Sequence, residues 1–136
     1  MAETFRLEVT TPERMVLRAD VEEAQVPARN GYLGILPGHA PLLAELKAGD
    51  ISYRHASRTD HIAVSAGFVE VLPEQTRVLV ETAEKAEEID VSRAQAARQR
   101  AEQRLHQPAP DTDLERAMVG LERALARLQV AAKSSK

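Results

Sequence analysis

The residue pattern of this chain changes abruptly near Ile89, and that change limits the folds it can adopt. Before Ile89, short runs of alternating apolar residues are separated by Gly and Pro, which is typical of β-strands. From Asp90 to Gln107 there is no Gly or Pro, and Ala, Arg and Gln dominate, which favours a helix. The sequence therefore predicts an α+β chain, with a β-sandwich over residues 1–86 and helices over residues 87–136.

Short apolar segments separated by turn residues fill the first part of the chain. Because no helical run separates them, parallel βαβ architecture is disfavoured and an antiparallel sandwich is predicted. Residues 83–88 are charged and are predicted to be a linker or a first helical turn. The predicted strands are Thr4–Thr10, Met15–Ala28 with an acidic interruption, Ile51–His55, Ile62–Ser65, Gly67–Leu72 and Gln75–Glu81.

The segment Gly31–Leu43, GYLGILPGHAPLL, combines apolar side chains with three Gly and two Pro. Such a density of Gly and Pro predicts special backbone angles and edges that cannot extend a β-ladder.

The helical part is predicted to be an antiparallel hairpin. Asp90 can cap a first helix that runs to about Gln107, and Pro108 and Pro110 then force a break. Asp111 or Asp113 can cap a second helix, and the short connection folds the two helices together. Pairing them about Ala109 sets Ala101 near Met118 and Ala94 near Leu125. The predicted seam of the second helix is Leu114, Ala117 or Met118, Leu121, Leu125 and Leu128.

Charge is distributed unevenly between the two parts. Residues 1–88 hold nine Lys and Arg against fifteen Asp and Glu, whereas residues 89–136 hold nine against six. A folded nucleic-acid binder concentrates positive charge, so nucleic acid is not an expected partner. A basic tail on an acidic body suits an acidic protein surface or a phosphate-bearing small molecule.

The sequence lacks the residues that several kinds of functional site require. The chain has no Cys, and its four His have no metal-ligand spacing, so no metal site is expected. There is no P-loop and no nucleophile–base arrangement, so a non-catalytic protein is expected. No stretch is long and apolar enough for membrane insertion, and the start of the chain does not have the pattern of a signal peptide.

Arginine residues of the two predicted helices are a candidate anion site. Arg93, Arg100 and Arg104 form one stripe of the first helix, and the hairpin model brings Arg123 and Arg127 close to Arg93. Guanidinium groups brought together repel one another unless an anion neutralises them, and a triphosphate offers bidentate acceptors. A solvated helix face is the plainer interpretation.

The chain resembles the epsilon subunit of F-type rotary ATP synthases over essentially its whole length. The resemblance rests on Gly31–Leu43, on AVSAGFVEV at Ala63–Val71 and on the two-helix tail. It implies a non-catalytic stalk subunit on the cytoplasmic face of the bacterial cell membrane. It also implies that the sandwich binds the gamma subunit and the c-ring, and that the tail extends to the alpha/beta catalytic head and restrains ATP hydrolysis.

The resemblance also implies site residues. The stalk and ring interface includes Gly31, Tyr32, Leu33 and His39, with Tyr32 standing where the family usually has Glu. Some members bind ATP, as a regulatory ligand rather than a required cofactor, through a motif matched by IDVSRA at residues 89–94; the role of magnesium stays open. The implied ATP-binding residues are Glu84, Ile89, Asp90, Arg93, Ala94, Arg100, Arg123 and Arg127.

The expected function is therefore coupling of ion flow to ATP synthesis, with a mobile hairpin that senses ATP. Two alternatives are a purely structural or inhibitory stalk subunit without nucleotide sensing, and a free-standing small-molecule-binding sandwich.

Overall fold

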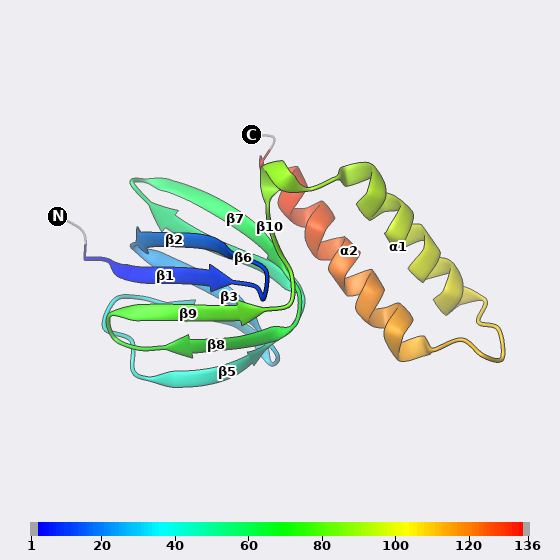
Figure 1. Ribbon diagram of the computed structural model, residues 1–136, viewed down its shortest axis with the longest axis horizontal. Coiled ribbons are helices and arrows are strands. Elements are labelled where there is room, and N and C mark those ends of the chain that lie inside the picture. The colour runs from blue at the N-terminus through cyan, green and yellow to red at the C-terminus, as the bar shows by residue number, and fades with distance from the viewer. Residues whose placement is uncertain (1–2, 135–136) are drawn as a thin grey trace.

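The computed structural model describes residues 3–134. A β-sandwich lies beside a two-helix hairpin, as Figure 1 shows. The predicted order of sandwich and then hairpin is confirmed. The strands are β1 (Phe5–Thr10), β2 (Met15–Val21), β3 (Glu23–Ala28), β4 (Gly31–Ile35), β5 (Leu42–Leu46), β6 (Gly49–His55), β7 (Arg58–Val64), β8 (Gly67–Val71), β9 (Gln75–Val80) and β10 (Ala83–Lys85).

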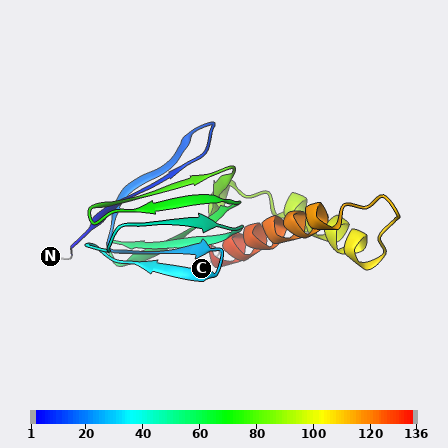
Figure 2. The same ribbon diagram turned by 90° about the horizontal axis from the view of Figure 1, so that it is seen from below.

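The strands form two layers that are joined at one corner (Figure 2). One layer has the order β10-β7-β6-β3-β4 and the other has the order β5-β8-β9-β1-β2. The single residue pair Ala28–Leu46 links β3 to β5 and so joins the layers. All strand pairs are antiparallel except β1 with β9, which is parallel. The predicted antiparallel sandwich is therefore correct apart from this pair.

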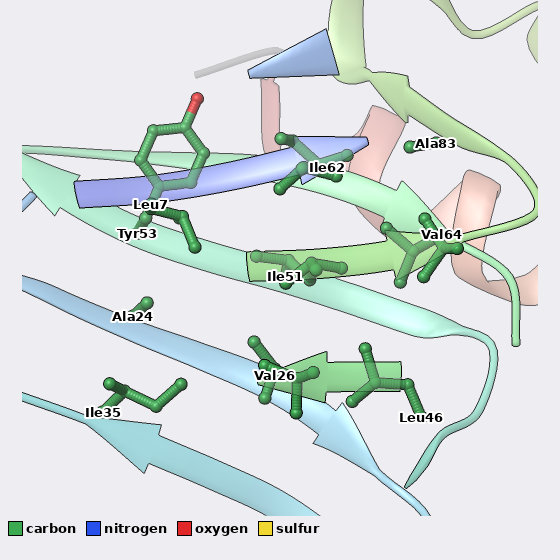
Figure 3. Packing of buried hydrophobic residues seen from close by; sticks show 14 of the residues in the cluster. Leu7, Ala24, Val26, Ile35, Leu46, Ile51, Tyr53, Ile62, Val64 and Ala83 are labelled. Atoms are coloured by element: carbon green, nitrogen blue, oxygen red, sulfur yellow. The ribbon is translucent and has the colours of Figure 1, made fainter. Parts of the chain in front are cut away.

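The core lies between the layers and is built from aliphatic side chains. Leu7 of β1, Ile51 of β6 and Ile62 of β7 are fully buried there, together with Val26 and Leu46 (Figure 3). Along β1 buried residues alternate with more exposed ones, as expected for a strand with one covered face, whereas β6 and β7 each contain three consecutive buried residues. The hydrophobic effect of this burial is the main stabilisation of the sandwich.

The structure corrects three sequence-based assignments. The segment Gly31–Leu43 does extend a ladder: β4 pairs with β3, and Leu42 begins β5. After β4 and β5, the third strand that was not predicted is β10. It occupies the start of residues 83–88, which were predicted to be a linker or helical turn, and is followed by the 3-10 turn η1 (Ala86–Glu88). Burial of Ala83 against the core explains why this charged segment pairs with β7.

The two helices begin where their caps were predicted. Helix α1 (Val91–His106) is capped by Asp90, whose carboxylate accepts from the backbone N–H of Arg93 at 3.1 Å. Helix α2 (Leu114–Ser134) is capped by Asp113 rather than Asp111, because the Asp113 carboxylate accepts from the N–H of Arg116 at 3.0 Å. These bonds satisfy N–H groups that the first helical turn leaves free.

The seam between the helices differs in part from the predicted one. Ala117 and Ala124 are buried in α2, whereas Met118 and Leu125 are about half exposed. Ala94 and Ala101 are the buried residues of α1, and Ala101 lines the same groove between the helices as Ala117. Small side chains at the seam let the helices approach closely. The prediction that Leu114 belongs to the seam was also wrong, because Leu114 is 50% exposed.

Helix α2 is the inner helix of the hairpin. It packs against β6, β7 and η1, whereas α1 packs against α2 on the side away from the sandwich (Figure 1). The tail therefore docks on the sandwich through α2.

Candidate functional site

Basic side chains of α2 meet acidic side chains of the sandwich where the hairpin docks. Nε of Arg127 donates to Oε1 of Glu84 in β10. Nη2 of Arg123 lies 3.5 Å from Oε2 of Glu81, just before β10. Arg123 and Arg127 are four residues apart and therefore share one face of the helix. The acidic body and the basic tail are thus complementary surfaces of the same chain.

Arg123 has an unsatisfied hydrogen-bond donor at this docking surface. Its Nε is buried without an acceptor among residues 3–134, although Nη2 pairs with Glu81. Arg123 and Arg127 line a narrow crevice together with Ala63, Val64 and Thr82. A buried donor without a partner is unusual in proteins, so Nε is a candidate donor to an anion, although the crevice has no space for one in this docked arrangement.

The predicted ATP-binding residues do not all lie together. Glu84, Arg123 and Arg127 meet at the docking surface. Arg93 and Arg100 are exposed on α1, and neither side chain makes an ion pair within the described range. The fold therefore brings together three of the eight predicted ATP-binding residues.

The other three predicted ATP-binding residues have structural roles in the docked hairpin. Asp90 caps α1, and Ala94 is buried at the helix seam. Ile89, which follows η1, is half-buried.

An open groove runs between the helices near the far end of the hairpin. It has a volume of about 660 Å³ and is lined in part by Ala101, Arg104, Arg116, Gly120 and Arg123. Small-molecule sites commonly have volumes between about 300 and 1,000 Å³, so the groove is large enough for a nucleotide-sized ligand. Arg123 belongs to both this groove and the docking surface.

A third contact joins the end of α2 to a buried carboxylate. Asp50 is 3% exposed, and its carboxylate lies 3.0 Å from Nδ1 of His61 and 2.6 Å from Nζ of Lys133. Sequence reasoning missed this cluster, because the predicted strand began only at Ile51 and His61 was one of four histidines without metal-ligand spacing. Asp50 instead lies within β6, and Lys133 is 83 residues further along the chain. No local pattern links the two residues, because their contact exists only in the folded chain.

The segment that leads into α1 is held on the sandwich as well. Arg14, in the turn between β1 and β2, donates to both carboxylate oxygens of Glu88 at 3.0 and 2.9 Å. These bonds and a hydrogen bond from the backbone N–H of Lys85 lower the pKa of Glu88. The bidentate pair fixes η1, so the hairpin starts from an anchored segment.

A polar cavity of about 610 Å³ opens beside the end of α2. Its lining includes Tyr53, His55, Asp60, His61 and Lys133. Burial raises the pKa of Tyr53 to about 12, with smaller contributions from the negative charges of Asp60 and Glu87. The cavity gives water a route to the ammonium group of Lys133.

The four predicted interface residues are distributed along β4 and the loop after it. Gly31 has a φ of +131°, which favours glycine, and Tyr32 is half-exposed. Leu33 instead packs partly against the core. His39 lies beyond the other end of β4, and its Nδ1 is 2.7 Å from the carbonyl oxygen of Ala40. A partner that contacted both Gly31 and His39 would extend along the whole strand.

Sequence reasoning also missed an apolar patch on the outer face of the second layer, which we call the outer patch: Leu43, Phe68 and Leu79. Phe68 and Leu79 are directly paired across β8 and β9 and are 54% and 55% exposed. Both also line an open, mainly apolar pocket of about 500 Å³. Leu43 on β5 is 71% exposed. The sequence did contain a signal for this patch: these residues alternate with core residues along their strands, which places them on the outer face.

Comparison with known proteins places this architecture. Residues 4–86 match the family model of the β-sandwich domain of the ATP synthase delta/epsilon chain, and residues 87–132 match that of its long α-helix domain. The chain belongs to the ATP synthase delta/epsilon family. Members of this family are non-catalytic stalk subunits, so the free-standing sandwich is no longer an alternative.

Relatives of this delta/epsilon-family chain cover nearly its full length. The ATP synthase epsilon chain of Solibacter usitatus is 49% identical and aligns over 98% of this chain and 99% of its own. That of Bacillus pumilus is 47% identical over 96% and 98%. That of Koribacter versatilis is 52% identical over 82% and 78%.

Solved structures share the fold of this delta/epsilon-family chain. A chain from the mitochondrial ATP synthase of Euglena gracilis, solved with OSCP, F1 and the c-ring, superposes with a TM-score of 0.81 at 21% identity. The match covers 95% of this chain and 81% of that one. No helix in the described part of our chain is long and apolar enough to cross a membrane, and no group of three potential metal ligands converges within residues 3–134.

Proposed function

We propose that this chain is the epsilon subunit of an F-type ATP synthase rotor, where it helps to couple ion flow to ATP synthesis. The proposal is supported by family membership over both domains and by relatives of that name at nearly full length. It would act as a peripheral subunit on the cytoplasmic face of the bacterial cell membrane.

The sandwich provides two surfaces for stalk partners. We assign the outer patch to the gamma subunit, because exposed apolar side chains on a sheet face are stabilised when a partner covers them. We assign Gly31, Tyr32, Leu33 and His39 to contact with the c-ring. Tyr32, in place of the usual Glu, would make that contact through an aromatic ring and a hydroxyl group rather than a carboxylate.

The hairpin is proposed to move. In the docked state Arg123 and Arg127 are paired with Glu81 and Glu84, and the seam between the helices is made of alanine. Surface ion pairs typically contribute about 1 kcal/mol or less each, so the docked state is not strongly favoured. Released, the same basic side chains are available to the alpha/beta catalytic head, where the extended tail would restrain ATP hydrolysis.

ATP sensing is the finer part of the proposal. Arg93 and Arg100 are exposed and make no ion pair within residues 3–134, so both can donate to phosphate oxygens, and Nε of Arg123 is a further donor without a partner there. Arg127 would have to exchange the carboxylate of Glu84 for phosphate. A ligand at a hundredfold excess over its Kd stabilises the form it binds by about 2.7 kcal/mol, which suffices to shift a weakly docked hairpin.

One observation favours the alternative of a stalk subunit without nucleotide sensing. Arg127 and Arg123 already have carboxylate partners within the chain, so their charges are neutralised without any ligand. In that case the hairpin would be held by the sandwich alone.

Isothermal titration calorimetry of the full chain with ATP distinguishes ATP sensing from a stalk subunit without nucleotide sensing. ATP sensing predicts measurable heat of binding that is strongly weakened by Arg93→Ala and by Arg127→Ala. Arg98→Ala is the matched control, because Arg98 lies on the same helix as Arg93 but pairs with Glu102. Absence of binding heat, or equal affinity in all variants, would reject ATP sensing and leave the stalk function.

A further inference from the structure

The carboxylate of Asp50 is buried, and its two ion-pair partners come from different parts of the molecule. His61, on the adjacent strand β7, approaches both carboxylate oxygens at 3.0 and 3.1 Å. Lys133, in the last turn of α2, donates from Nζ to Oδ2 at 2.6 Å. One partner belongs to the sandwich and the other belongs to the hairpin.

The position of Asp50 is fixed by the sandwich alone. It pairs with Ala63 in the β6–β7 ladder, and its backbone N–H donates to the hydroxyl of Tyr32 at 3.2 Å. The carboxylate therefore stays where it is when the hairpin moves. Asp50 lies on the face of β6 that α2 covers, because its neighbour Ile51 points into the core, so docking of α2 helps to bury the carboxylate and requires that it be paired.

Lys133 is the partner that can leave. Its side chain is 41% exposed, against 4% for the side chain of Asp50, and it borders the polar cavity next to His61. Water in that cavity can solvate the ammonium group as it withdraws. Asp50 would then keep only the imidazole of His61.

This contact differs from the two other ion pairs that dock α2. The side chain of Glu81 is 70% exposed and that of Glu84 is 31% exposed, so water already solvates both carboxylates. An ion pair with a buried partner is screened much less than an exposed one. Among the three described pairs between α2 and the sandwich, Asp50–Lys133 therefore has the greatest influence on docking.

We propose that Asp50 is a catch that holds the last turn of α2 on the sandwich, with Lys133 as its releasable partner and His61 as its fixed partner. The proposal rests on the proposed mobility of the hairpin. It adds that release begins at the end of α2, where a single contact must break.

Amide hydrogen exchange of the full chain tests the catch. Lys133→Ala is expected to accelerate exchange at Arg127 and Val130 about tenfold or more, while the amides of β8 and β9 keep their rates. Lys47→Ala is the matched control, because Lys47 is exposed and its side chain makes no ion pair within residues 3–134. Equal exchange in the Lys133→Ala and Lys47→Ala variants would overturn the proposal.

A second background separates the catch from a simple loss of helix stability. In Asp50→Asn, which keeps the side-chain shape, Lys133→Ala should add little, because the charge it pairs with is already gone. A further tenfold acceleration in that background would show that Lys133 acts on helix α2 itself, and the catch would be rejected.

Failure of hairpin mobility gives a different result. If the α2 amides of the unmodified chain exchange as slowly as those of β9, the hairpin opens only on global unfolding and the mobile tail is rejected. The Lys133→Ala comparison still decides the catch in that case. Rapid exchange in the unmodified chain with no effect of Lys133→Ala would instead reject the catch alone.

Discussion

Nη2 of Arg14 donates to both carboxylate oxygens of Glu88, at 3.0 and 2.9 Å, and so links the β1–β2 turn to the segment that leads into α1. The two residues are 74 positions apart. Because this pair lies before α1, the proposed movement of the hairpin would leave the anchored segment η1 on the sandwich, which would place the hinge at Ile89 and Asp90.

The Arg14–Glu88 pair predicts a specific pH dependence. The pKa of Glu88 is lowered in the folded chain by the hydrogen bonds from Arg14 and from the N–H of Lys85. A lowered folded pKa means that the stabilisation is present above the unfolded pKa and is lost as the pH falls through the folded value. Arg14→Ala should therefore lower the Tm at pH 7 but have little effect at pH 3.

The size of that effect should be small. Both side chains are more than a third exposed, so the pair should contribute about 0.5 kcal/mol. Thermal unfolding of Arg14→Ala and the unmodified chain at both pH values measures it. A Tm difference that grows on acidification would contradict the assignment.

Gly67 should tolerate no side chain. A Cβ placed there would lie 2.0 Å from the backbone oxygen of Leu79, so β8 and β9 would have to move apart. We expect Gly67→Ala to destabilise the sandwich by about 3 kcal/mol. Gly34→Ala is the control, because its Cβ would meet nothing within 4 Å. Equal denaturant midpoints for the two variants would contradict this packing.

The hairpin seam should reject larger side chains at alanine positions. Ala124 is fully buried, so Ala124→Leu should destabilise hairpin packing by about 1–3 kcal/mol. Leu125→Ala, at the neighbouring exposed position, should have much less effect. Hydrogen exchange of the α1 amides measures the effect of each variant. A larger effect of Leu125→Ala than of Ala124→Leu would support the seam that was predicted from the sequence.

The outer patch should bind the gamma subunit. Phe68→Glu is expected to weaken binding of the chain to gamma by about thirtyfold or more, as for a central aromatic contact in an interface. Leu114→Glu is the matched control, because Leu114 is equally exposed but lies on the hairpin. Binding can be followed by co-purification and titration. Similar losses for both variants would remove the outer patch from the interface.

Local rules predicted much of this fold. Alternation of apolar residues placed most of the core strands, and the side-chain chemistry of Asp90 and Asp113 placed the helix starts. Strands β4, β5 and β10 were missed because their pairing partners, β3, β8 and β7, are supplied by the tertiary structure. Gly and Pro in a segment argue against a strand locally, yet an edge strand can accommodate them.

The seam shows where helix periodicity is insufficient. The stripes through Ala117 and Ala124 and through Met118 and Leu125 have the same seven-residue spacing but lie about 100° apart around the helix, so spacing alone could not choose between them. The register was set by close approach of the two helices, which alanine allows. Leu114 and Leu125 of the predicted seam are exposed, whereas Leu121 and Leu128 are half-buried.

The site was only partly predictable for a similar reason. Net charge indicated a basic tail and an acidic body, but not that each would be the other's partner. Glu84, Arg123 and Arg127 were named for a nucleotide, and in the folded chain they also dock α2. Asp50 and Lys133 gave no local signal, because their contact exists only after the hairpin folds back on the sandwich.

The ATP hydrolysis rate of the assembled complex tests most directly whether the charge of the sandwich restrains the tail. Glu84→Arg leaves the hairpin sequence unchanged but replaces the partner of Arg127 with a like charge, so the hairpin should be released. We predict a hydrolysis rate below that of the unmodified complex, with recovery when Arg127→Glu is added to restore the ion pair with reversed charges. An unchanged or increased rate in Glu84→Arg would contradict the account.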